Sequence, residues 1–248
     1  MAQVTFDFTG KNFIVTGASS GMGRQIALEL AEAGAKVLAI ARRQNELEKL
    51  KEVYPENIIP ASLDVCDEKK LETTIKEFVG GYGKIDGAVH AAGISDITPI
   101  KNYDKNLADE IMNISFWAAI SLINLAIKTK YANKNSSYIL FSSVAAFSSE
   151  KGMFAYSAAK SATNSAIKSI AKEISKKNQR INTIVPGWIK TPMTDKAGQI
   201  SNLETFFDKH LLGAGNSEDV SGMVLFLLSD RAKWITGTDV VVDGGYLA

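Results

Sequence analysis

One stretch near the start of the chain, residues 13–31, reads FIVTGASSGMGRQIALELA. Aromatic and β-branched residues come first, glycines follow, and apolar residues then recur at a helical period, which predicts a strand, a tight turn and a helix. Glycines let a ligand approach the backbone closely, and the free amides at a helix start favour an anion. An ordinary strand-to-helix connection would have the same pattern. Other motifs along the chain are therefore needed to distinguish it from a phosphate-binding turn. The expected phosphate contacts are Gly17, Ser19, Ser20, Gly21, Met22 and Gly23.

Short β-rich runs alternate with longer helical patterns along the rest of the chain. The runs are Asn12–Thr16, Lys36–Ala41, Ile58–Ser62, Gly87–Ala91, Ser137–Phe141, Ile181–Val185 and Asp239–Val242. This alternation predicts an α/β fold: a Rossmann-type, doubly wound parallel sheet of about seven strands, with helices on both faces and the ligand site at the carboxyl ends of the strands. We expect residues 1–248 to form a single nucleotide-binding domain, with residues 194–215 as an irregular, mobile substrate loop.

Composition argues against several function classes. The 248 residues include 28 basic and 27 acidic side chains, so a formal net charge of +1 provides no field that would recruit nucleic acid or an anionic membrane. The single cysteine, Cys66, suits a reducing compartment. The sequence shows no secretory leader, no long apolar run and no metal-ligand cluster, which predicts a cytoplasmic protein that acts on a small molecule.

A second pattern, Tyr156-Ser157-Ala158-Ala159-Lys160, places a phenol and an ammonium four residues apart. In a helix this spacing puts both groups on one face, one turn apart. A free tyrosine has a pKa of about 10, and a neighbouring positive charge lowers that pKa. The pair therefore predicts a tyrosine that exchanges protons near neutral pH. Two solvated side chains on a helix surface would give the same pattern, and the motifs that accompany the pair argue against that alternative.

Together these motifs resemble the short-chain dehydrogenase/reductase family, and in pattern most closely its members of the 3-oxoacyl-acyl-carrier-protein reductase kind. The resemblance spans nearly the whole chain, and the motifs occur in one order. They are the glycine turn, Asp64-Val65, Ala91-Ala92-Gly93, Asn113, Ser143, Tyr156 with Lys160, Pro186-Gly187 and Asp243-Gly244-Gly245. The resemblance implies an oxidoreductase that moves a hydride between a nicotinamide and a carbonyl or secondary alcohol.

The resemblance also implies a role for each catalytic residue. Tyr156 would protonate the substrate oxygen, Ser143 would hydrogen-bond that oxygen, and Lys160 would hold the nicotinamide ribose. Asn113 would hold a water that links the site to solvent, although a lone helical asparagine is also found as a surface or capping residue. Ser142 competes with Ser143 for the serine role, and the family's spacing to the tyrosine favours Ser143.

Further cofactor contacts follow from the resemblance. They are Asp64 and Val65 at the adenine, Ala91, Ala92 and Gly93 beside the adenosine ribose, and Pro186, Gly187, Ile189 and Thr191 at the nicotinamide amide. One departure is His90-Ala91 where the family commonly has Asn-Asn, so the side-chain hydrogen bonds made there are either absent or supplied by His90. We expect His90 to be a buried, hydrogen-bonded histidine rather than a proton relay. Cys66 replaces a more usual hydroxyl residue, and His210 is expected in a loop.

Two arginines, Arg42 and Arg43, follow the second predicted strand. At this position of a dinucleotide fold a carboxylate holds the ribose hydroxyls, whereas an arginine accommodates a 2′-phosphate. A guanidinium binds phosphate through charge-assisted hydrogen bonds. NADP(H) is therefore favoured over NAD(H), with Arg42 as the phosphate ligand and Arg43 as its neighbour and the bystander of the two.

Substrate and assembly remain open at this stage. Candidate pocket residues are mostly apolar, and they are Ser95–Ile97, Ala145–Phe147, Phe154, Trp188, Ile200, Leu203, Phe206 and Phe207. They favour an acyl chain or a hydrophobic ketone over a free polyol, but the same Phe and Leu residues also fit the packing face of an amphipathic helix. The most specific interpretation is a 3-oxoacyl thioester substrate, free or bound to a carrier protein. The alternatives are a sugar or polyol dehydrogenase and, in another class, a non-catalytic dinucleotide-binding sensor or scaffold. Basic residues offered for a carrier are Lys128, Lys130, Lys172, Lys176 and Lys177. Two long helical patterns are expected, one beginning near Met153 and one over Lys101–Lys130. The resemblance implies a homotetramer, or a homodimer, formed through two such helices.

Overall fold

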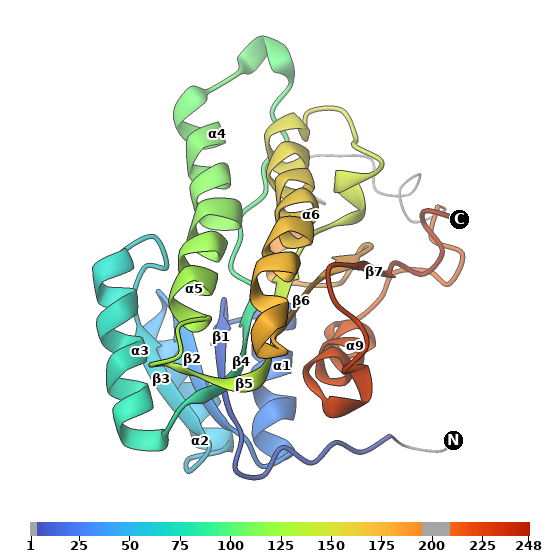
Figure 1. Cartoon of the computed structure of the whole chain (residues 1–248). Coiled ribbons are helices and arrows are strands. Elements are labelled where there is room, and N and C mark those ends of the chain that lie inside the picture. Colours follow the sequence, from blue (N-terminus) through green and yellow to red (C-terminus); the bar gives the residue numbers. More distant parts are fainter. Residues whose placement is uncertain (1–3, 195–208) are drawn as a thin grey trace.

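The computed structural model describes residues 4–194 and 209–248, which contain one parallel sheet of seven strands (Figure 1). The strands are β1 (Asn12–Thr16), β2 (Lys36–Ala41), β3 (Ile58–Ser62), β4 (Ile85–His90), β5 (Ala132–Phe141), β6 (Arg180–Pro186) and β7 (Asp239–Val242). Their order in the sheet is β3-β2-β1-β4-β5-β6-β7. The chain thus builds outward from β1 in one direction and then, from β4, in the other, which confirms the doubly wound α/β prediction.

Helices cover both faces of this sheet (Figure 1). They are α1 (Gly21–Glu32), α2 (Gln44–Val53), α3 (Glu68–Tyr82), α4 (Lys105–Met112), α5 (Ala118–Ala126), α6 (Phe154–Ile174) and α9 (Ser217–Leu228). Shorter turns are η1 (Ile100–Asn102), η2 (Asn113–Trp117), η3 (Val144–Ala146), η4 (Ser175–Lys177) and η5 (Asp230–Ala232). In the described part of the chain, no helix is both long and apolar enough to cross a membrane.

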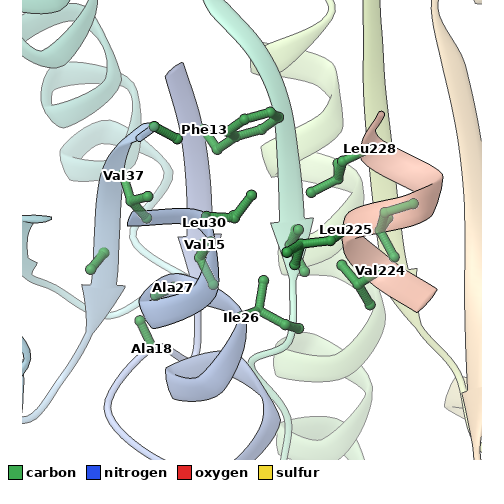
Figure 2. Close-up of a cluster of buried hydrophobic side chains, with 14 of the residues drawn as sticks. Phe13, Val15, Ala18, Ile26, Ala27, Leu30, Val37, Val224, Leu225 and Leu228 are labelled. Atoms are coloured by element: carbon green, nitrogen blue, oxygen red, sulfur yellow. The ribbon is translucent and has the colours of Figure 1, made fainter. Parts of the chain in front are cut away.

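Alternate residues of each central strand enter different cores, because successive side chains of a strand point to opposite faces. Phe13 and Val15 belong to a core that α1, α2 and α9 close, and Figure 2 shows them in one cluster with Ile26 of α1 and Leu225 of α9. Ile14 belongs to the opposite core, which is closed by α3, α5 and α6. Burial on both faces fixes the register of the strands, since a slip by one residue would exchange the two sets.

Three elements differ from the sequence-based expectation. Strand β4 spans Ile85–His90, whereas Gly87–Ala91 was expected. Strand β5 begins at Ala132, five residues before the expected start. This first part is irregular, since Asn135 has a left-handed φ of 68° and the pairing with β4 shifts register between Ile85 and Gly87. The helical pattern expected over Lys101–Lys130 is divided into α4, the π-helical turn η2 and α5. In η2 the N–H of Ala118 bonds to the carbonyl of Asn113, five residues back. Such π turns are rare and occur frequently at functional sites.

Candidate active site

The glycine turn packs directly against the end of β4. Gly17 has a φ of 70°, and a Cβ on it would lie 2.7 Å from the amide nitrogen of Ala92. A Cβ on Gly23 would lie 2.5 Å from the carbonyl oxygen of Gly17. Both positions therefore require glycine. Helix α1 starts at Gly21, with Thr191 so close that a Cβ on Gly21 would be 3.1 Å from the Thr191 Cγ2 atom. The turn thus offers helix-start amides beside a segment 170 residues away in sequence, and this cradle fits a nucleotide phosphate.

Arg43 reaches back to this turn. Its guanidinium donates hydrogen bonds to the hydroxyls of Ser19, at 2.8 Å, and Ser20, at 2.7 Å. Arg42 is exposed, and its carbonyl oxygen accepts a 3.1 Å bond from Ser62. The sequence favoured Arg42 and treated Arg43 as the bystander, whereas the structure brings Arg43 to the turn.

His90, at the end of β4, links three elements. It is 1% exposed, its Nδ1 atom lies 3.0 Å from the hydroxyl of Thr16 on β1, and its Nε2 atom lies 3.0 Å from the carbonyl oxygen of Ile114 in η2. Because the carbonyl can only accept, Nε2 carries the proton and Nδ1 accepts from Thr16. Burial lowers the pKa of His90 to about 4. The expectation of a buried, hydrogen-bonded histidine is confirmed, and it supplies the bonds that the departure from Asn-Asn put in doubt.

Ser143 and Tyr156 face each other across the loop that joins β5 to α6. The Ser143 hydroxyl accepts a 3.2 Å bond from the amide of Ala145, which fixes the serine at the start of η3. Tyr156 lies in the first turn of α6. Burial raises the pKa of Tyr156 above 10, and a hydrogen bond with the Ser143 hydroxyl acts in the opposite direction. The prediction of a lowered tyrosine pKa is therefore wrong for the protein alone, since burial outweighs the other influences.

Lys160 lies one helical turn further along α6 and is 4% exposed. Its ammonium donates a 2.8 Å hydrogen bond to the carbonyl oxygen of Phe141, the last residue of β5, and lies 5.5 Å from the centre of the Tyr156 ring. Burial lowers the pKa of Lys160 to about 8. Ser142 is also buried, and its hydroxyl donates to the backbone carbonyl of Lys160 at 3.3 Å. Ser142 therefore supports the lysine backbone, while Ser143 faces the phenol.

The turn η2 brings a residue to the site that the sequence did not single out. Asn113, its first residue, is exposed. Ser115, two residues later, is 1% exposed and lies beside Gly93, where a Cβ on Gly93 would be 3.4 Å from its Oγ atom and 3.7 Å from the Lys160 Nζ atom. A uniform α-helix was expected here, and only the π turn shifts the register, so no sequence signal pointed to Ser115.

The remaining predicted cofactor contacts lie at strand ends, where they were expected. Ala91 donates to the Thr16 carbonyl at 3.3 Å, so the backbone of residues 91–93 runs past the glycine turn. Asp64 is exposed and accepts a 2.9 Å bond from the amide of Cys66, whereas Val65 is buried in the core with Leu38 and Ile40. The side chain of Val65 thus packs inward and leaves only its backbone to face a ligand.

The segment after β6 is held by contacts from the C-terminal part of the chain. The Gly187 amide donates to Val242 at 3.0 Å, and Ile189 pairs with Gly215 in an isolated bridge. Pro186 ends β6. The hydroxyl oxygens of Thr191 and Thr194 share a hydrogen bond of 3.2 Å. These contacts fix the backbone of residues 186–194 above the ends of β6 and β7.

His210 lies in a loop, as expected, but it is also 4% exposed, and its Nε2 atom accepts a 2.9 Å bond from the amide of Trp188. Nearby, Glu150 accepts bonds from Lys209 at 2.5 Å and from the Tyr246 hydroxyl at 3.1 Å. Lys209 and Tyr246 therefore hold Glu150, which lies in the loop that joins β5 to α6 (residues 142–153, the serine loop). Four pocket candidates, Ile200, Leu203, Phe206 and Phe207, and most of the expected substrate loop 194–215 lie outside the described residues.

The lysines suggested as carrier contacts lie far from this site. Lys172 lies in the last turn of α6, sixteen residues after Tyr156, which is about 24 Å along a helix axis. Lys128 and Lys130 lie between α5 and the first residue of β5, at the amino end of the strands. These side chains are therefore at the edge of the sheet opposite Tyr156 of the same chain.

Comparisons with known proteins agree with this geometry. A family model described as Enoyl-(Acyl carrier protein) reductase matches residues 17–247. The chain is 31% identical to the 3-oxoacyl-acyl-carrier-protein reductase FabG of Thermotoga maritima, over 95% of this chain and 97% of that protein. It is 34% identical to the FabG of Rickettsia conorii, over 97% of this chain and 98% of that protein.

Solved structures show the same relationship. A short-chain dehydrogenase/reductase from Brucella melitensis, titled glucose/ribitol dehydrogenase, superposes with a TM-score of 0.90 at 26% identity and covers 98% of this chain and 99% of its own. A short-chain type dehydrogenase/reductase from Mycobacterium marinum also has a TM-score of 0.90 at 26% identity, over 97% of each chain. The chain belongs to the short-chain dehydrogenase/reductase family of oxidoreductases.

Proposed function

We propose that this protein is an NADP(H)-dependent reductase of carbonyl compounds, with a 3-oxoacyl thioester as its substrate. The observation that carries the proposal is the arrangement of Ser143, Tyr156 and Lys160 beside the glycine turn. Support for the substrate comes from the relatives, which are named 3-oxoacyl-acyl-carrier-protein reductases and match nearly the whole chain.

When bound, the nicotinamide supplies the hydride. Negative charge then develops on the carbonyl oxygen, and the Ser143 hydroxyl donates a hydrogen bond to it while Tyr156 gives up its proton. The raised pKa of Tyr156 keeps the phenol protonated at neutral pH, which suits a proton donor and hence the direction of reduction. Lys160 keeps a positive charge close to the tyrosinate that forms.

The preference for NADP(H) rests on Arg43. Its guanidinium is already oriented by Ser19 and Ser20 at the turn where the adenosine ribose would meet the protein. A 2′-phosphate there would accept charge-assisted hydrogen bonds from this group. Arg42 lies exposed next to it and adds positive charge without a comparable anchor.

A sugar or polyol substrate is the second candidate, because a structure titled glucose/ribitol dehydrogenase superposes over nearly the whole chain. The half-buried Trp188 and the exposed Phe147 and Phe154 present apolar surface near the serine loop, which favours an acyl chain over a free polyol.

The test is NADPH consumption with four substrates: an acetoacetyl thioester, a crotonyl thioester, a ketose and an aromatic ketone. We expect the highest kcat/KM with the acetoacetyl thioester. The crotonyl thioester is included because the matching family model is described as an enoyl reductase. Faster turnover of the ketose would support the second candidate, and tight NADPH binding without turnover of any substrate would support a non-catalytic dinucleotide sensor.

We also propose that the protein assembles as a homotetramer through α5 and α6. Trp117, at the end of η2, is 55% exposed and Phe154, at the start of α6, is 37% exposed, so both leave apolar surface on these helices. Light scattering of the eluted protein should give four times the chain mass, and a monomer at micromolar concentration would contradict the assembly.

A further inference from the structure

His210 is buried against the backbone that follows β6. It is 4% exposed, and its Nε2 atom accepts a 2.9 Å hydrogen bond from the amide of Trp188. Because a backbone amide can only donate, Nε2 carries no proton and the imidazole is neutral. A Cβ on Gly187 would lie 2.9 Å from the same nitrogen, so the ring also packs against the residue before Trp188. The side chain therefore contacts both residues of this step of the backbone.

The C-terminal segment holds His210 in place. The amide of Gly213 donates to the carbonyl of His210 at 2.9 Å, and the amide of Leu212 donates to the carbonyl of Gly244 at 3.0 Å. The imidazole lies 4.8 Å, centre to centre, from the ring of Tyr246. The acceptor for the Trp188 amide is therefore in position before any ligand arrives, which is the arrangement that a binding site needs.

The backbone after β6 lies between the two ends of the candidate site. At one end β6 lies beside β5, where the amide of Ser142 donates to the carbonyl of Ile184 at 2.9 Å. At the other end a Cβ on Gly21, in the glycine turn, would be 3.1 Å from the Thr191 Cγ2 atom. A dinucleotide with its phosphates at that turn and its reactive ring beside the catalytic hydroxyls would therefore pass along residues 187–191.

His210 fixes the direction of the amides in this segment. Trp188 donates to His210, and Lys190 donates to a backbone carbonyl at 2.9 Å. In extended backbone alternate amides point to the same side, so the Ile189 amide between them points to the other side. Without an acceptor at residue 210, the peptide group between Gly187 and Trp188 can rotate, because glycine has no side chain that restricts it. The orientation of the following amides would then no longer be fixed.

We infer that His210 is a positioning residue for the cofactor: its neutral imidazole holds the backbone of Gly187 and Trp188 so that the residues after it receive the nicotinamide end of a bound dinucleotide. The inference rests on the proposed function, which brings a nicotinamide to this site. Because His210 acts on one end of the cofactor only, its removal should weaken the binding of the nicotinamide end and spare the adenosine end.

The test compares His210→Leu with His210→Gln and Lys209→Gln in the full-length protein. Leucine fills space without an acceptor, whereas the side-chain oxygen of glutamine can take the place of Nε2 and accept from Trp188. Lys209 is the matched neighbour, since its ammonium binds Glu150 at 2.5 Å. Calorimetry measures the dissociation constants of two ligands, NADPH and 2′-phospho-ADP-ribose, which lacks the nicotinamide ring. NADH and ADP-ribose form a second pair, so the comparison does not depend on a 2′-phosphate.

His210→Leu should weaken NADPH binding by about 10-fold, because a buried amide loses its acceptor. Its dissociation constant for 2′-phospho-ADP-ribose should stay that of the wild-type protein. His210→Gln and Lys209→Gln should bind both ligands as the wild-type protein does. Wild-type NADPH binding in His210→Leu would overturn the inference. So would equal weakening of both ligands, which indicates general damage to the site, or a loss in His210→Gln as large as that in His210→Leu.

Hydrogen exchange of the Trp188 amide tests the same inference in the wild-type protein. Followed by NMR, this exchange should slow when NADPH binds but not when 2′-phospho-ADP-ribose binds. The same exchange rate with both ligands would also overturn the inference. If NADPH binding depends on His210 as expected but no carbonyl is reduced, the proposed function fails and the inference stands. If a carbonyl is reduced and His210→Leu binds NADPH normally, the inference fails and the proposed function stands.

Discussion

The ammonium of Lys160 lies 5.5 Å from the centre of the Tyr156 ring, one turn away on the same helix. Burial moves the two pKa values in opposite directions: it raises that of Tyr156 and lowers that of Lys160 to about 8. Both shifts favour the neutral form, as expected for groups withdrawn from water. At neutral pH the pair is therefore a protonated phenol beside a charged ammonium, which is the state that a proton donor for carbonyl reduction requires.

The pH dependence of reduction should follow Lys160. As the pH rises through about 8, Lys160 loses its charge while Tyr156 stays protonated, so kcat for carbonyl reduction should fall above about pH 8. Initial rates from pH 6 to 10 test this, with circular dichroism at each pH to confirm that the protein is folded. A rate that stays level up to pH 10 would exclude Lys160 as the titrating group.

The two neighbouring serines should behave differently when each is replaced by alanine. Ser143 faces the phenol, so Ser143→Ala removes a donor to the developing oxyanion and should lower kcat by ~10²-fold. Ser142 donates only to the backbone of Lys160, at 3.3 Å, so Ser142→Ala should have a much smaller effect on kcat. Steady-state kinetics of both variants decide the matter, and equal losses would refute the assignment.

The choice between NADPH and NADH should depend on Arg43 more than on Arg42. Arg43→Ala removes the anchored guanidinium and should reduce the ratio of kcat/KM for NADPH to that for NADH by about 10- to 100-fold. Arg42→Ala, the matched neighbour, should reduce this ratio less. A larger effect at Arg42 would restore the assignment that the sequence alone favoured.

Much of the fold was predictable because burial on both faces leaves a strong pattern in the sequence. Five strands were located within a residue of their observed bounds, including β1 and β2, whose apolar runs are continuous. The first part of β5 was missed because Asn133, Lys134 and Asn135 are polar and Asn135 adopts a left-handed φ, which is typical of a turn.

The sequence placed the candidate site residues at strand ends and helix starts, but it could not give their surroundings. Sequence spacing placed Tyr156 and Lys160 on one helix face, yet it carries no information on burial, which reverses the expected direction of the tyrosine pKa. Likewise the sequence favoured Arg42 over Arg43 as the phosphate ligand. Only the start of α2, where Arg43 is the residue before the helix, turns its side chain toward the glycine turn.

Stability should fall in acid because of His90. Its pKa is about 4 in the folded protein and near 6.5 when unfolded, so the unfolded state takes up a proton first as the pH falls. The stabilisation is complete above pH 6.5 and is lost between pH 6.5 and 4, to a total of about 3 kcal/mol. Urea unfolding at several pH values measures this. In a His90→Asn variant, the free energy of unfolding should depend less on pH between 6.5 and 4. An identical dependence on pH in both proteins would show that another group is responsible.

The most direct test of the proposed chemistry is the turnover of a Tyr156→Phe variant with NADPH and an acetoacetyl thioester. The substitution removes one oxygen atom from a half-buried ring, so the fold and the NADPH dissociation constant should remain those of the wild-type protein. If the Tyr156 phenol is the proton donor, kcat should fall by ~10²- to 10⁴-fold. A variant that binds NADPH normally and reduces the thioester at the wild-type rate would contradict the account.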